Sequence, residues 1–201
     1  MNTQSLAASL FQQLQQGQGL QQVSQQLGLD SAQTRQAVGS ALPLLLGAMG
    51  QNASEPQGAQ SLLNALQRDH SGGGGGFDLG GILGAVMGGG GSGATDGAGI
   101  LGHVFGGQQP QAAAALGQKT GLDSGTSGKL LAILAPIVMS FLAQRFAQQG
   151  NAGELSSALG QETQHAGGGL GSLLGGALDQ DGDGQFGASD LLKLGAGLLK
   201  R

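Results

Sequence analysis

Gly28-Leu29-Asp30-Ser31 recurs 93 residues later as Gly121-Leu122-Asp123-Ser124, and Pro43 recurs at the same spacing as Pro136. Apolar positions between these landmarks also correspond, so that Leu45 matches Val138. A shared register of this kind is the signature of an internal duplication. The alternative is chance similarity between two helices rich in Leu and Ala, because low complexity inflates such matches.

Each copy has the residues that typically end one helix and begin the next, which predicts two helices joined by a tight turn. Gly28 or Gly121 would supply the left-handed residue that ends the first helix. Asp30 or Asp123 would then cap the second helix by accepting hydrogen bonds from its free backbone N–H groups. Gln33 follows Asp30 at capping-box spacing, whereas the second copy has a threonine at that position.

Apolar residues at helical spacing surround these turns. Leu20, Val23 and Leu27 form one stripe before the first turn. The helix after the second turn is apolar around most of its circumference, which predicts a place at the centre of a bundle. Pro43 and Pro136 fall inside the two second helices, where a proline is expected to kink or end a helix.

Several features of the sequence carry a resemblance to a known family: the Gln25-Gln26-Leu27-Gly28-Leu29-Asp30 turn, the Leu42-Pro43-Leu44-Leu45 helix, their second-copy equivalents and the Gly/Leu islands described below. Together they resemble the bacterial YidB-like family, a domain of unknown function. The resemblance covers about residues 20–147. It implies an all-helical fold and a bacterial source, and it brings no activity and no catalytic residue. The second copy departs from the pattern where Lys119 stands opposite Gln26 and Thr120 replaces Leu27.

Glycine separates the two copies. It accounts for 43 of the 201 residues and fills almost half of residues 71–107, although apolar islands at 77–83 and 96–101 interrupt it. These islands could be short docked helices, and a solvated linker is the alternative for the first half of the segment. We therefore expect an all-α chain in four parts: helical units at 1–70 and 108–165, a Gly-rich insert at 71–107, and a tail at 166–201.

Charge and cysteine content exclude several functions. Charged residues make up 10% of the chain, the net charge is −4, and the few cations are scattered, so nucleic acid would find no cationic cluster. The chain has no cysteine and its first residues lack a signal-peptide pattern, which predicts a cytoplasmic protein. The longest apolar run, 130–143, is shorter than a membrane span, so a buried helix is expected and membrane contact is not.

The motif with most chemistry lies at residues 179–190, Asp-Gln-Asp-Gly-Asp-Gly-Gln-Phe-Gly-Ala-Ser-Asp. It matches the twelve-residue EF-hand loop, in which oxygens at positions 1, 3, 5, 7 and 12 bind calcium and a glycine at position 6 makes the sharp turn. The predicted calcium ligands are Asp179, Asp181, Asp183, the backbone carbonyl of Gln185, and Asp190.

A solvated acidic tail is the alternative, but four carboxylates in twelve residues repel one another unless a cation offsets them. Position 12 is Asp190 instead of the usual Glu, which predicts weaker bidentate binding and stronger competition from magnesium. Elsewhere, Glu162 and His165 have the i, i+3 spacing of some helical metal sites, but only one such pair exists, so we expect a surface pair.

No nucleophile and base can be paired, and no Gly-rich phosphate loop has the required Lys-Ser/Thr ending. The sequence therefore predicts a non-enzymatic bacterial interaction or structural protein, whose calcium loop orders its C-terminus. Its expected partner is a second copy of itself or an unknown protein, and not nucleic acid. A self-associating or membrane-surface protein using the Gly/Leu islands is the alternative, and a helix-turn-helix DNA binder ranks behind both.

Overall fold

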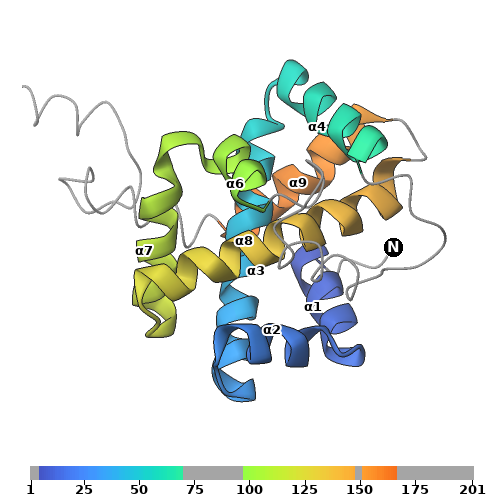
Figure 1. The fold of residues 1–201 in the computed structure, drawn as a ribbon. Helices are drawn as coiled ribbons and strands as arrows, with labels where there is room; N and C mark the ends of the chain where they lie inside the picture. The colour runs from blue at the N-terminus through green and yellow to red at the C-terminus, as the bar shows by residue number, and fades with distance from the viewer. Residues whose placement is uncertain (1–4, 70–96, 148–150, 167–201) are drawn as a thin grey trace, which may run out of the picture.

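The computed structural model describes residues 5–69, 97–147 and 151–166, and every regular element in these ranges is helical. The all-α prediction is confirmed for this part of the chain. Figure 1 shows α8 crossing α3 near the middle of the molecule, with other helices around this pair. The elements are α1 (Leu6–Gln16), α2 (Gly19–Leu27), α3 (Ser31–Asn52), α4 (Pro56–Asp69), α6 (Gly97–Phe105), a 3-10 turn (Gly106–Gln108), α7 (Gln109–Thr120), α8 (Ser124–Leu142), a π-helical turn (Ala143–Ala147) and α9 (Ala152–Ala166).

Two glycines end helices where the sequence predicts that they should. Gly28 follows α2 with a φ of +66°, and Gly121 follows α7 with a φ of +76°. Both lie in the left-handed region, which a residue with a Cβ enters only at a cost. The chain therefore turns in the same way from α2 into α3 and from α7 into α8.

The aspartates after these turns cap α3 and α8. One carboxylate oxygen of Asp30, Oδ1, accepts hydrogen bonds from the backbone N–H groups of Ala32 and Gln33, each at 2.8 Å. Asp123 Oδ1 accepts one from the N–H of Thr126 at 2.9 Å. Both predicted N-caps are confirmed, because these bonds satisfy donors that have no partner within the helix.

Of the two expected effects of the prolines, a kink or the end of the helix, the second does not occur. Pro43 lies inside α3 and Pro136 inside α8, and both helices continue beyond them. A proline removes the hydrogen bond to the carbonyl four residues earlier, and its ring crowds that carbonyl, but the other helical hydrogen bonds remain. Fully buried neighbours such as Leu42 and Ile137 keep the rest of each helix packed.

A helix packs against each of the two positions that a proline has altered, α1 in one case and α6 in the other. Pro136 leaves the Ala132 carbonyl without its helical donor, and Gly97 of α6 approaches that oxygen so closely that an added Cβ would lie 1.9 Å from it. In α3, the corresponding carbonyl belongs to Gly39, and the ring of Phe11 from α1 lies 3.8 Å from an ideal Cβ there. Gly97, which belongs to the apolar island at 96–101, is thus needed for the close packing of α6 on α8.

The core is aliphatic and its centre is formed by α3 and α8. α3 packs against α1, α2, α7, α8 and α9, and the hydroxyl of Ser156 in α9 donates to the Ala53 carbonyl at the end of α3. α9 approaches α3 closely at Gly50, where a Cβ would lie 2.6 Å from the Leu159 carbonyl oxygen. The last described helix therefore completes the packing of a helix from the first half of the chain. The fully buried leucines of α3 and α8 are Leu42, Leu45, Leu46, Leu130, Leu131, Leu134 and Leu142.

Candidate functional site

The five predicted calcium ligands, Asp179, Asp181, Asp183, Gln185 and Asp190, lie outside the described residues. The calcium loop therefore stays a prediction from the sequence. Within residues 5–69, 97–147 and 151–166, no three side chains of His, Cys, Asp or Glu come together as a metal site would require.

Glu162 is not on the surface, so the expectation of an exposed pair with His165 is wrong for this carboxylate. The side chain is 2% exposed, and its Oε1 accepts a hydrogen bond from the backbone N–H of Leu6. Leu6 is the first residue of α1, where the backbone N–H groups have no partner within the helix. The carboxylate of α9 therefore binds the N-terminus of α1.

The spacing of apolar residues in α9 could have predicted the burial of Glu162. Leu155, Leu159 and Glu162 follow one another at four and three residues, and the two leucines are fully buried. Glu162 thus continues an apolar stripe, which the i, i+3 pairing with His165 obscured. The side chain of His165 lies outside the described part.

Two side-chain oxygens accept hydrogen bonds from backbone N–H groups at the start of α1. Besides Glu162, the hydroxyl oxygen of Ser5 accepts from the N–H of Ala8 at 3.1 Å. A negative charge at a helix N-terminus is also favourable, because the helix dipole is positive there. These contacts identify Glu162 as a structural group that positions α1 beside α9.

Among the titratable groups that the structure describes, Asp123 has a lowered pKa. The Thr126 hydroxyl, followed by the backbone N–H of the same residue, hydrogen-bonds the ionised carboxylate and lowers its pKa below the ordinary value of 3.8. The threonine that replaces the capping-box glutamine therefore takes part in the cap. The lowered pKa of Asp123 therefore reflects helix capping.

The geometry of α3 differs from that of a DNA-recognition helix. Half of its 22 residues are buried beneath other helices, and its first two turns offer Arg35 beside the acidic cap Asp30. A recognition helix instead presents a face to the major groove and is flanked by cations. The buried position of α3 suits a core helix.

The 23-residue segment Ser124–Phe146 is long and apolar enough to cross a membrane by composition alone, with a mean hydropathy of 1.7 in an 18-residue window. In this structure 72% of it is buried by other helices of the protein. A core helix of a folded domain has these same properties, as expected for the run at 130–143.

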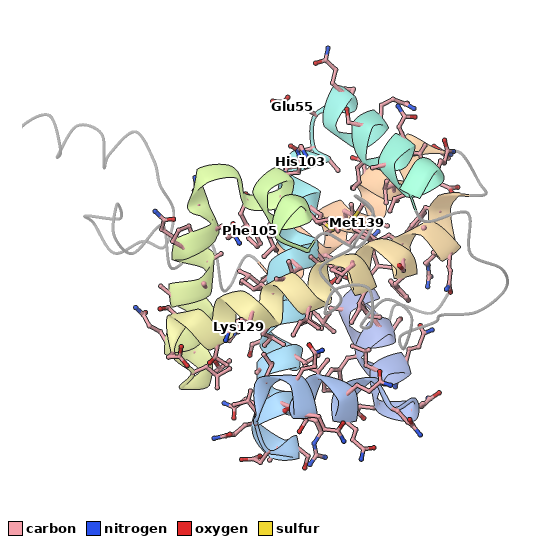
Figure 2. All side chains as sticks on the ribbon, in the orientation of Figure 1. Glu55, His103, Phe105, Lys129 and Met139 are labelled. Atoms are coloured by element: carbon pink, nitrogen blue, oxygen red, sulfur yellow. The ribbon has the colours of Figure 1, made fainter. Side chains whose placement is uncertain are left out.

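α6 contains the described part of the island at 96–101, and three of its apolar side chains are only partly covered. Leu101 is fully buried, while Ile100, Val104 and Phe105 are half-buried. Figure 2 shows Phe105 and His103 on this helix, close to where α3 leads into α4. The side-chain amide of Asn52 donates to the Val104 carbonyl there at 2.7 Å and fixes the end of α6.

Comparison with known proteins gives a family and no activity. No curated protein and no solved structure is significantly similar to the chain. A family model described as bacterial protein of unknown function (DUF937) matches residues 9–145, which is more than half of the 201 residues. The matched range extends from α1 to the end of the core helix α8 and supports the expectation of a bacterial family without an assigned activity. The chain belongs to this DUF937 family of bacterial proteins.

Proposed function

We propose that this protein is a non-enzymatic helical interaction or structural module of the bacterial cytoplasm whose C-terminal loop binds calcium. The observation that carries the proposal is the spacing of Asp179, Asp181, Asp183 and Asp190 around Gly184. Calcium takes six to eight oxygen ligands, and alternating aspartates about a tight turn deliver them from one short segment. The absence of cysteine fits a reducing compartment.

Calcium would act by ordering the C-terminal residues. Without the ion, the four carboxylates repel one another, and the adjoining glycines make ordering costly. With it, the loop would fix the angle between the leucine-bearing segments 170–178 and 191–199, whose apolar residues could then bind the helical body or a second chain. The proposed role is therefore calcium-controlled binding to a second copy of the chain or to another protein.

We also propose that the helical body arose by duplication, with units at 1–70 and 108–165. Gly28 and Gly121 end helices in the same conformation, Asp30 and Asp123 cap the next ones, and each unit carries a proline inside its central helix. Helices α4 and α9 also correspond, because Ala59, Leu63 and Leu66 are buried at the spacing of Leu155, Leu159 and Glu162. Since α9 packs on α3, the two units would be interleaved.

Calorimetric titration with calcium, together with NMR spectra of the isotope-labelled full chain, tests the calcium proposal. We expect heat of binding and resonance shifts centred on Gly184 and Asp190. The double variant Asp179→Asn with Asp181→Asn should abolish both responses, because it removes two charged ligands at positions 1 and 3.

The matched control is Asp78→Asn with Asp96→Asn, which removes the same charge from another Gly-rich segment. This control should bind calcium as the unchanged protein does. Equal loss of calcium binding in the two double variants would show that the response depends on total charge. If the unchanged protein gives no response at millimolar calcium, the proposal is overturned.

The alternative is self-association or membrane-surface binding through the Gly/Leu islands. The half-buried Ile100, Val104 and Phe105 of α6 favour it, because apolar side chains at a surface gain by being covered. Vesicle co-sedimentation separates the two proposals. Binding to vesicles that is lost in Ile100→Ser with Val104→Ser would favour the membrane, whereas no sedimentation favours the interaction module. Gel shifts with random duplex DNA at low salt should give no binding.

A further inference from the structure

One end of the helical body carries exposed amides and almost no charge. The first 29 residues contain no Asp, Glu, Lys, Arg or His. α1, α2 and the start of α3 pack on one another, and in Figure 1 they form the end opposite α4 and α6. We call this region the glutamine-rich end and define it by exposed glutamines of these three helices: Gln12, Gln15, Gln16, Gln21, Gln25 and Gln33.

The charges that adjoin this end cancel. Asp30 and Arg35 are both exposed in the first turns of α3 and have opposite signs. By contrast, α7 and the first turns of α8 expose Lys119, Asp123 and Lys129. Among the described residues of α1, α2 and the first turns of α3, the exposed charges therefore sum to zero.

An aromatic side chain lies within the same three-helix end. Phe11 of α1 is half-buried, and its ring packs against Gly39, which is itself exposed. Protein interfaces are typically depleted of charge at the centre and enriched in aromatic anchors surrounded by polar groups. Phe11 among exposed amides has this composition.

We propose that the glutamine-rich end pairs with the same end of a second copy of this chain. A primary amide both donates and accepts hydrogen bonds, so a surface of glutamines is complementary to itself. In a two-fold interface each residue of one copy meets its counterpart's neighbours, so Arg35 of one copy can approach Asp30 of the other. A chain of net charge −4 repels its copy least where the surface is neutral.

The experiment is sedimentation velocity with light scattering on the full chain, from micromolar to millimolar protein. It is carried out in EDTA, so that its result is independent of the proposed calcium loop. We expect a monomer–dimer equilibrium. The triple variant Gln12→Glu, Gln16→Glu and Gln25→Glu should raise the dissociation constant about tenfold or more, because carboxylates of like sign would face one another. High salt should partly restore its dimerisation by screening that repulsion.

The matched control is Gln111→Glu, Gln118→Glu and Gln161→Glu, which adds the same charge at exposed positions of α7 and α9. It should dimerise like the unchanged protein, and circular dichroism should confirm that both triple variants fold. A protein that is monomeric at every concentration overturns the proposal, as does equal weakening by the two triple variants. A dimer that is lost instead in Ile100→Ser with Val104→Ser would assign the contact to α6 and also overturn it.

Discussion

The backbone N–H of Leu6 donates a hydrogen bond to the buried carboxylate of Glu162, a residue 156 positions later in the chain. The bond joins the first turn of α1 to the last turns of α9. Leu66 of α4, which is fully buried and apolar, follows Ala59 and Leu63 at the spacing by which Glu162 follows Leu155 and Leu159. α9 thus has a carboxylate at the buried position where the N-terminus of α1 needs an acceptor.

Replacing Glu162 should destabilise the protein in proportion to the acceptor that is lost. Glu162→Ala leaves the Leu6 N–H buried without its partner, and we expect a loss of about 1–3 kcal/mol in the free energy of unfolding. Glu162→Gln keeps an acceptor oxygen and should lose less. Urea denaturation measures both, and the exposed neighbour Gln161→Ala should change the value by no more than about 0.5 kcal/mol. An equal effect of the two alanine variants would show that the buried bond contributes nothing.

Glycines at helix contacts should respond differently from an exposed helical glycine. Gly50→Ala places a methyl group 2.6 Å from the Leu159 carbonyl oxygen, so α9 must shift away from α3. The expected cost is about 1–3 kcal/mol. Gly102→Ala meets nothing within 4 Å and should stabilise α6 by up to about 1 kcal/mol. Thermal unfolding measures both changes, and a Gly50→Ala variant as stable as the parent would contradict the close approach.

The cap at Asp123 should make stability depend on pH in acid. Because the pKa of its carboxyl is lower in the folded than in the unfolded protein, the ionised group stabilises the fold above its ordinary value of 3.8, and this contribution is lost as the pH falls through the lowered pKa. The difference in melting temperature between the parent and Asp123→Ala should therefore be larger at neutral pH than well below pH 3.8.

Asp123→Asn provides the reference for this measurement. Asparagine also caps helices but does not titrate, so the difference between Asp123→Asn and Asp123→Ala should stay nearly constant across the same range. A parent whose advantage over Asp123→Ala is also constant with pH would show that ionisation of the cap does not matter.

The calcium loop should bind more tightly when its last ligand is lengthened. Asp190→Glu places the longer carboxylate at position 12, where it can bind calcium through both oxygens. We expect a lower dissociation constant for calcium and weaker competition by magnesium, measured by calorimetry with each ion. Asp96→Glu serves as a control outside the loop. An unchanged calcium affinity in Asp190→Glu would place position 12 outside the coordination sphere.

The turns between helices could be predicted from the sequence because the interactions that form them are local. A left-handed glycine at 28 or 121, followed two residues later by a capping aspartate, depends on backbone sterics and on donors within one turn. The central position of α8 was also predictable from its apolar circumference. These features need no knowledge of the rest of the chain.

The contacts between distant segments could not be predicted in the same way. Glu162 has its partner 156 residues away, and the i, i+3 spacing with His165 led to a wrong surface assignment. Pro43 and Pro136 are tolerated because burial on either side holds α3 and α8 together. In both cases the deciding energy comes from tertiary packing, which local spacing does not encode.

The packing of α9 on α3 also sets the order in which the chain can fold as it leaves the ribosome. Asn52 at the end of α3 precedes Ala152 at the start of α9 by 100 residues. At about 5–20 residues per second, the ribosome takes roughly 5–20 s to make those 100 residues. The side of α3 that α9 covers therefore stays without its covering helix for that time, and its apolar residues are exposed to aggregation until α9 is made.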